Sequence, residues 1–296
     1  MSELPKVIDA LAEMFADLAA GLVSSPSRTV VEHGDGRQLL AGASIWPRRG
    51  VGTVKVTTLT PDNPTRGLPL IHGTVVLTDL ETGEIRALLD GAEVTAVRTG
   101  AVAALATRLW APKDADEMAV IGAGVQARAL VRALSTVRPI KTVRVCSRTR
   151  ERAEEFAEWI RVTHRHEAIV YDSPREAVDG VPLICTATST ADVTPILRAA
   201  WITPGAHVNV IGGTHEDAIE VEPSLLAKAH VVVEQRAAAM EDAGEVRAAL
   251  AAGWIRIEDV HELGGAATPD GGTTVFRSVG MAIEDTAAAA ALYEGP

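Results

Sequence analysis

Cysteine is scarce in this sequence of 296 residues, which contains only Cys146 and Cys185. The two lie far apart and not in a C-x-x-C spacing, which argues against a disulfide framework and against a cysteine-based zinc site. Both sit in apolar runs, VRVCS and LICTAT. We therefore expect two buried free thiols.

Positive charge is also in deficit, because 28 lysines and arginines face 39 aspartates and glutamates, for a formal net charge of −11. Such a balance repels phosphate backbones, so no nucleic-acid partner is expected. An anionic cofactor would have to bind through local hydrogen-bond donors.

Long apolar runs are missing, since none approaches the roughly 18–20 residues needed to span a bilayer. The N-terminal segment carries Glu3, Asp9, Glu13 and Asp17 without a basic stretch, unlike a signal peptide. We expect a cytoplasmic protein that does not associate with membranes.

Motifs of hydrolases and metal sites are absent from the sequence as well. There is no G-x-S-x-G, and the eight histidines show no metal-ligand spacing. His164 and His166 are two residues apart, a spacing that does not share one helical face. Neither a nucleophilic hydrolase nor a metal cofactor is expected.

The first third of the chain is predicted to be rich in strands. Residues 4–22 have helical apolar spacing, and four strand-like segments separated by turn signals follow at 28–33, 38–46, 52–60 and 72–80. In TVKVT, alternation puts Thr53, Lys55 and Thr57 on one face of a strand.

After these strands, a helix is expected to run to Trp110 with Thr95 as its N-cap. Arg98 and Thr99 would lie in its first turn, where a cation opposes the helix dipole.

From Met118 onward, short apolar strands alternate with helices. This alternation predicts an α/β fold with a mainly parallel sheet covered on both faces. The stretch AVIGAGVQARAL contains Gly122, Gly124 and Ala127 as G-x-G-x-x-A between a strand and a helix. The first glycine allows a tight turn, the second lets pyrophosphate approach the backbone, and the small third residue lets helix and strand pack closely. This context predicts a Rossmann dinucleotide site, with a ligand-free tight turn as the alternative.

The next strand ends in Ser147, Arg148 and Thr149, where NAD-binding proteins place an acid on the ribose. Hydroxyls and a guanidinium suit a ribose 2′-phosphate, so NADP(H) is favoured and NAD(H) remains possible. The alternative is that Arg148 pairs with Glu151 or Glu154 on the following helix.

Three cations from separate segments are candidates for binding a small carboxylate: Arg28, Lys55 and Arg98. Arginine offers a bidentate grip, and lysine offers charge and a transferable proton. Each alone is more often a solvated or paired surface residue, and sequence spacing does not show that they converge.

Six segments occur in one order: RTGAVAALAT, AVIGAGVQA, VRVCSRT, TATST followed by proline, PGAHVNVIGG and TTVFRSVGMAIEDTAAA. From Arg28 to Tyr293 the sequence thereby resembles the ornithine cyclodeaminase/mu-crystallin family. The resemblance implies a substrate and dimerisation domain of residues 1–112 joined by a C-terminal helix at 279–296. It further implies a Rossmann domain at 113–278, a homodimer, and NAD(P)-dependent action on a small amino or 2-imino acid.

The resemblance also assigns residues to roles. Lys55 and Arg98 would be catalytic, and with Arg28 they match the family's substrate-carboxylate positions. The matches to cofactor positions are Thr74 and Thr99 at the nicotinamide, Gly122, Ala123, Gly124, Val125 and Gln126 at the pyrophosphate, Ser147, Arg148 and Thr149 at the adenosine end, and Thr188 in the loop after the fourth Rossmann strand.

One departure from the family pattern bears on the reaction. Thr214, assigned to the substrate site, stands where cyclodeaminases carry an aspartate, and Asp217 lies three positions on. Threonine donates a hydrogen bond but is no base near neutral pH. We therefore expect reduction of a cyclic ketimine, such as pyrroline-2-carboxylate or piperideine-2-carboxylate. Deamination of ornithine or alanine and a non-catalytic, NADP-dependent binding protein stay open. Glu220 matches a family glutamate, with a structural role equally open.

Overall fold

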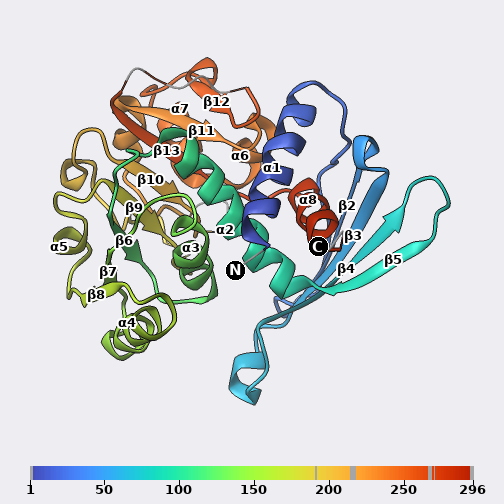
Figure 1. The fold of residues 1–296 in the computed structure, drawn as a ribbon, viewed down its shortest axis with the longest axis horizontal. Helices are drawn as coiled ribbons and strands as arrows, with labels where there is room; N and C mark the ends of the chain where they lie inside the picture. Colours follow the sequence, from blue (N-terminus) through green and yellow to red (C-terminus); the bar gives the residue numbers. More distant parts are fainter. Residues whose placement is uncertain (1–2, 191, 214–217, 266–268, 270, 294–296) are drawn as a thin grey trace. The chain divides into compact units, whose positions relative to one another are not determined.

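The computed structural model describes residues 3–190, 192–213, 218–265, 269 and 271–293. The chain forms two compact units, residues 1–98 with 280–296 and residues 99–279 (Figure 1). The division falls inside helix α2 (Gly91–Trp110). The predicted boundary lies just after this helix, at residue 112, with the C-terminal helix predicted to join the first domain.

The first unit is a five-stranded antiparallel sheet with two long helices on one face. Its strands lie in sequence order: β1 (Thr29–Glu32), β2 (Gln38–Trp46), β3 (Val51–Leu59), β4 (Ile71–Asp79) and β5 (Ile85–Asp90). Short 3₁₀ turns occur at Pro47–Arg49 and Asn63–Arg66. Helix α8 (Ala282–Tyr293) packs across β2, β3 and β4, and α1 (Leu4–Ala19) packs on α8 (Figure 1). The four predicted strands are confirmed, and β5 is one that the sequence analysis did not single out.

The two faces of this sheet differ in an unexpected way. The polar residues of β3, rather than its valines, point toward α8: Thr53 is buried, and its Oγ1 lies 2.6 Å from Thr286 Oγ1. Val54 and Val56 point to the other face and are 40% and 41% exposed. Apolar side chains from every strand but β4 are exposed on that same outer face: Val31, Leu39, Ile45, Val54, Val56 and Leu88.

The second unit is built on an eight-stranded parallel sheet. Its strands are β6 (Glu117–Ile121), β7 (Thr142–Cys146), β8 (Glu167–Val170), β9 (Leu183–Thr186), β10 (His207–Val210), β11 (Ala229–Val233), β12 (Val260–Glu262) and β13 (Thr273–Arg277). Their order is β12-β11-β13-β10-β9-β6-β7-β8. The chain runs outward from β6 to β8 and then returns to the other side of β6 with β9. This reversal is the switch point at which doubly wound sheets bind ligands.

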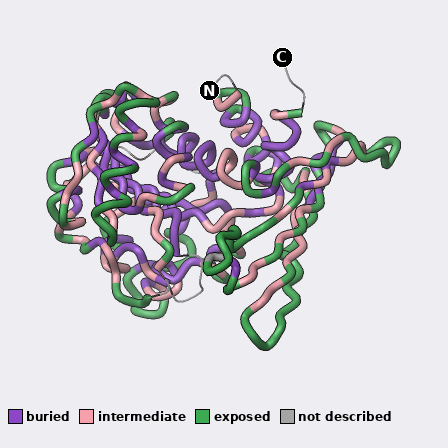
Figure 2. Tube along the Cα trace, turned by 90° about the horizontal axis from the view of Figure 1, so that it is seen from below, coloured by how far each residue is buried: buried purple, intermediate pink, exposed green. Residues whose placement is uncertain are grey.

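Helices cover the parallel sheet, and the central strands β9 and β10 are fully buried while the edge strand β8 is partly exposed (Figure 2). They are α3 (Val125–Leu134), α4 (Arg150–His164), α5 (Pro174–Val178), α6 (Arg236–Asp242) and α7 (Gly244–Ala251), with 3₁₀ turns at Ala199–Trp201, Pro223–Lys228 and Ile257–Asp259. Cys146 and Cys185 are buried free thiols, as expected, and burial raises the pKa of Cys185 to about 12. The predicted α/β fold with a Rossmann-type sheet and a second α+β unit is confirmed. None of the helices among the described residues is long and apolar enough to cross a membrane.

Helix α2 starts four residues earlier than the sequence analysis predicts, so the N-cap assigned to Thr95 is wrong. Asp90 precedes the helix, and its Oδ1 accepts a 2.8 Å bond from the backbone N–H of Glu93. Thr95 lies one turn inside, where its hydroxyl donates to Gly91 O. Arg98 is therefore two turns into the helix, and the argument from an unfavourable dipole at a first-turn arginine does not apply.

The other end of α2 is capped by a buried arginine. Arg138 donates to the carbonyl oxygens of Thr107 at 2.6 Å, Ala111 at 2.7 Å and Pro112 at 2.8 Å. Thr107 O also accepts the last helical bond, from Ala111 N at 3.0 Å, while Ala111 and Pro112 follow the helix. A cation at this end also complements the negative end of the helix dipole. Arg138 thus ties the carboxyl end of α2 to the segment before β7.

Candidate active site

The glycine loop after β6 fits closely against the loop after β9. Gly122 has φ +120°, and a Cβ built on it would lie 2.3 Å from Ala187 O. Ala187 N donates to Ile121 O at 2.8 Å, which holds the two loops together. Only glycine meets both requirements, a positive φ and an approach this close. The tight turn expected of the first glycine is therefore present at the switch point.

The second glycine faces open space. Gly124 is the N-cap of α3. Within the described parts of the chain, no side-chain cap is present there, and a Cβ on Gly124 would meet nothing within 4 Å. The first N–H groups of a helix have no intrahelical partners, and they attract anions. In the same turn, Gln126 Oε1 is buried and has no hydrogen-bond partner among the residues that the structure describes. This helix end thus has the features that a pyrophosphate site requires, and contact of Gly122 to Gln126 with a dinucleotide stays a prediction.

The segment after β7 leads into α4 and is exposed. Thr149 is the N-cap of α4 and its side chain makes no capping bond. Within the described part of the chain, Arg148 makes no hydrogen bond or ion pair. The alternative partner Glu154 is instead bound by Arg150, which also contacts Asp172. Ser147, Arg148 and Thr149 therefore leave hydroxyls and a guanidinium at the carboxyl end of β7.

A buried carboxylate organises the loops after β9 and β10. Glu220 Oε1 accepts bonds from the N–H and the hydroxyl of Thr188, and Oε2 accepts from the Thr186 hydroxyl and from Gly212 N, all at 2.7 Å. Burial raises the pKa of Glu220, and these bonds oppose the shift. Glu220 thus has a structural role, and the predicted cofactor residue Thr188 is held by it.

A second layer of buried charges supports Glu220. Glu245 Oε1 accepts from Glu220 N at 2.7 Å, and Glu245 Oε2 lies 2.9 Å from Arg277 Nε. Arg277 also donates to Gly212 O at 2.7 Å and to Gly213 O at 2.8 Å. All three side chains are almost fully buried. Arg277 and Glu245 were not predicted as part of a site, and no local sequence pattern identifies them.

In the first unit, α8 brings two carboxylates to two of the predicted cations. Lys55 Nζ lies 3.2 Å from Asp285 Oδ1, and Arg98 NH1 lies 3.1 Å from Glu284 Oε2. Arg98 Nε is 3.6 Å from the same Asp285 oxygen. The four side chains form a cluster, here called the cation cluster, in which none is more than 17% exposed. The cluster is charge-balanced within the chain.

Lys55, the lysine of the cation cluster, is largely buried. Lys55 Nζ donates to Thr95 Oγ1 at 2.5 Å as well as to Asp285. Burial lowers the pKa of Lys55, the charge of Asp285 raises it, and the nearby Arg98 lowers it again. A lysine with a lowered pKa gives up its proton more readily than an exposed one.

The arginine of the cation cluster is fixed by backbone as well as by charge. Gly280 has φ +77°, and a Cβ on it would lie 2.6 Å from Arg98 NH1. Glu284 Oε1 accepts from Met281 N at 2.8 Å, which is the capping interaction expected of a glutamate in the first turn of α8. Glu284 therefore caps α8 with one oxygen and binds Arg98 with the other.

The remaining predicted substrate and nicotinamide residues have different positions. Gly42 on β2 lies directly opposite Lys55 on β3. A Cβ built on Gly42 would lie 3.9 Å from the Cβ of Arg28, which precedes β1. Arg28 thus lies on the same sheet face as Lys55. Thr74 pairs with Val56 and is exposed on the opposite face, so its contact with nicotinamide stays a prediction. Thr99 follows Arg98 and is buried. Thr214 and Asp217 lie outside the described residues.

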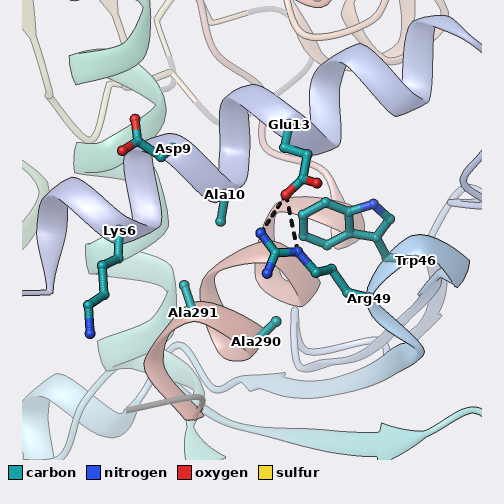
Figure 3. Close-up of a pocket in the computed structure, with 8 residues that line it drawn as sticks. All are labelled: Lys6, Asp9, Ala10, Glu13, Trp46, Arg49, Ala290 and Ala291. Atoms are coloured by element: carbon teal, nitrogen blue, oxygen red, sulfur yellow. Dashed lines mark hydrogen bonds and ion pairs between the residues drawn. The ribbon is translucent and has the colours of Figure 1, made fainter. Parts of the chain in front are cut away.

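A pocket of the first unit involves none of the predicted residues (Figure 3). It lies among α1, the end of β2 and α8, with Ala10, Ala290 and Ala291 along the helices. Arg49 covers the Trp46 ring at 5.4 Å and binds Glu13 at 3.1 Å. Among the described residues, no group of three or more His, Cys, Asp or Glu is arranged to hold a metal.

A glycine loop and a helix amino terminus at the switch point of a parallel sheet define a Rossmann-type dinucleotide-binding protein. The chain belongs to the ornithine cyclodeaminase/mu-crystallin family, whose model matches residues 2–295.

Relatives with named activities are similar to this chain over nearly its whole length. It is 35% identical to the ketimine reductase mu-crystallin of Mus musculus over 98% of this chain and 91% of the relative. The structure of Thermococcus litoralis Δ1-pyrroline-2-carboxylate reductase in complex with NADH and L-proline is 31% identical, with a TM-score of 0.91 over 98% of this chain and 92% of that one. An archaeal alanine dehydrogenase dimer with bound NAD is 28% identical, with a TM-score of 0.89 over 98% and 91%.

Proposed function

We propose that this protein uses NAD(P)H to reduce the C=N bond of a small 2-imino acid to the corresponding amino acid. Cyclic ketimines such as pyrroline-2-carboxylate and piperideine-2-carboxylate are the proposed substrates. The observation that carries the proposal is the cation cluster, in which Lys55 and Arg98 lie together on one sheet face. The ketimine reductase and the pyrroline-2-carboxylate reductase among the relatives support the same reaction.

In this proposal, Arg98 and Arg28 hold the substrate carboxylate. A guanidinium binds a carboxylate through two parallel hydrogen bonds, which fixes the position and the tilt of the substrate. Lys55 donates the proton that the substrate nitrogen gains. The reduced cofactor, when bound, supplies the hydride, so the protein mainly orients the reactants and sets the local field.

The dinucleotide is proposed to bind at Gly122 to Gln126, with Ser147, Arg148 and Thr149 at its adenosine end. The exposed Arg148 favours NADP(H), because a guanidinium accommodates the 2′-phosphate that an acid would repel. NAD(H) is the alternative, since the two solved relatives above contain NADH and NAD.

Threonine at position 214 supports reduction over cyclodeamination. A cyclodeaminase needs a carboxylate at this place to act on the substrate amino group, and a hydroxyl does not supply that base near neutral pH. Release of ammonia from ornithine or alanine would contradict this part of the proposal.

Steady-state oxidation of NADPH and NADH with each of the two cyclic ketimines tests the proposed function. We expect turnover with at least one ketimine. Protein that binds the cofactor, as shown by fluorescence titration, but oxidises it with neither ketimine would contradict the proposal. That result would favour a cofactor-dependent binding protein.

A further inference from the structure

We propose that Asp285 is a positioning residue for Lys55. Asp285 and Thr95 each accept one of the three N–H bonds of the Lys55 ammonium group. The third N–H is then left for the substrate nitrogen. This inference rests on the proposed function. It assigns a role in the reaction to the amino end of α8, to which the sequence analysis gave no site residue.

The hydroxyl of Thr95 is restricted to accepting a bond from Lys55. A threonine hydroxyl has a single proton to donate. Thr95 Oγ1 donates it to Gly91 O at 2.6 Å, inside the first turn of α2. Only a lone pair remains for Lys55 Nζ at 2.5 Å. Thr95 therefore acts as a fixed acceptor that orients one N–H of the ammonium.

Asp285 orients the second N–H of the ammonium and supplies the counter-charge. Its side chain is 7% exposed, and its Oδ1 is 3.2 Å from Lys55 Nζ. The two bonds to Thr95 and Asp285 are the interactions that the Lys55 amine makes within the described chain. An ammonium has three donors, so one N–H remains for a ligand. Lys55 retains 17% of its side-chain surface, which leaves it accessible.

Asp285 is the carboxylate of the cation cluster that hydrogen-bonds Lys55, and the same oxygen also lies 3.6 Å from Arg98 Nε. Glu284 is occupied with Arg98 and with the Met281 N–H. Without Asp285, Lys55 would face the positive charge of Arg98 in a buried setting, and both effects oppose the ammonium form. Asp285 therefore keeps the proton on Lys55 until the substrate takes it.

Reduction of the C=N bond adds one hydride to the substrate carbon and one proton to the substrate nitrogen. The bound reduced cofactor would supply the hydride, so one of its C–H bonds would break as the new C–H bond forms on the substrate carbon. The C=N π pair would move to nitrogen, and the cofactor would be oxidised. Nitrogen forms an N–H bond with the Lys55 proton, and the N–H bond of Lys55 breaks. Neutral Lys55 then takes a proton from solvent.

The test measures the titration of Lys55 directly, independently of turnover. Full-length protein saturated with oxidised cofactor is acetylated with trace acetic anhydride across a pH series, and labelling of Lys55 is quantified by peptide mass spectrometry. Asp285→Asn should move the labelling midpoint to lower pH by about one unit or more, because the counter-charge is lost. Glu284→Gln is the matched control, a neighbouring buried carboxylate that should produce a smaller shift. An unchanged midpoint in Asp285→Asn, or equal shifts in the two variants, would overturn the proposal.

Turnover supplies the second readout. Asp285→Asn should lower kcat by about tenfold or more and move the alkaline limb of the pH profile to lower pH, with the dinucleotide Kd unchanged. A loss confined to KM would contradict a positioning role.

If Asp285→Asn does not fold, Thr95→Val provides the test, since it removes the fixed acceptor and keeps the charge. It should lower kcat, and unaltered kcat would refute the proposal. Absence of ketimine reduction by the wild type would refute the proposed function, while the labelling midpoints would still decide the role of Asp285.

Discussion

Lys55 and Arg98 meet two carboxylates that residue spacing alone does not reveal. Alternation along β3 predicts that Lys55 projects from a sheet face, and the structure confirms it. The partners Glu284 and Asp285 come from a helix more than 180 positions away in the sequence. A one-dimensional pattern carries no information about which distant helix covers a strand.

The first prediction at this scale concerns these two cations. Lys55→Met and Arg98→Met should each reduce kcat/KM with a ketimine by about 100-fold or more, because each removes a charged group proposed to contact the substrate. Neither residue belongs to the unit that carries the glycine loop, so the dinucleotide Kd should stay within about threefold of the wild type. Steady-state kinetics and fluorescence titration measure the two effects. Full turnover in either variant would remove that residue from the proposed site.

Cofactor selectivity is a second property of single residues. Arg148→Ala should weaken NADPH binding by about tenfold or more and leave NADH binding nearly unchanged, since only the 2′-phosphate would lose a charged partner. Arg165→Ala, at another exposed arginine of the same unit, is the control. Equal weakening of both cofactors in Arg148→Ala would argue against a phosphate contact.

A buried histidine predicts how stability depends on pH. His207 bonds Thr274 and Asn209, and burial lowers the pKa of His207 to about 3. The unfolded chain therefore binds a proton that the folded chain excludes, and stability is lost as the pH falls from 6.5 toward 3. His207→Gln should reduce this dependence by about 1.4 kcal/mol per pH unit within that window.

Urea unfolding at several pH values between 4 and 7 measures this dependence. Identical slopes in wild type and His207→Gln would show that His207 does not titrate on unfolding.

At the scale of elements, patterns located most strands and helices, while their ends and faces depended on tertiary contacts. The start of α2 was missed because Thr95 is a good N-cap residue, whereas Asp90, at the end of β5, is the residue that binds the first turn. The sheet face of β3 that packs on α8 is the polar one. The usual inference that the apolar face is buried would have placed Lys55 on the outside.

The glycine loop yields a matched pair of variants. Gly124→Ala adds a methyl group in open space, so the protein should keep its Tm but bind dinucleotide about tenfold or more weakly. Gly122→Ala forces a positive φ and a 2.3 Å approach to Ala187 O, so it should destabilise the fold itself. Calorimetry and cofactor titration separate the two effects. Unweakened binding in Gly124→Ala would contradict a pyrophosphate site at this helix end.

At the scale of the whole molecule, composition and motif order predicted the fold class and the family, and both are confirmed. Alternating strands and helices dictate a parallel sheet, and a glycine loop at its switch point follows from the same rules. The buried Glu220, Glu245 and Arg277 could not be found in this way. Their charges are satisfied by one another and by backbone and hydroxyl groups that the completed fold brings within reach.

The exposed outer face of the antiparallel sheet leads to a prediction about assembly. We propose that this face forms a homodimer interface, because exposed apolar patches of this kind mark interaction sites. Light scattering should give twice the chain mass of 31.1 kDa. Val54→Asp should yield monomers. Val162→Asp, at an equally apolar and more exposed position on α4, should leave the dimer intact. A monomeric wild type would contradict the proposal.

The central claim is that the cation cluster binds the carboxylate of a small imino or amino acid. A crystal structure of the protein with oxidised cofactor and L-proline tests it most directly. The proline carboxylate should lie within hydrogen-bond distance of Arg98 and Arg28, with its nitrogen near Lys55 Nζ. Proline bound without contact to any of these three residues would contradict the account.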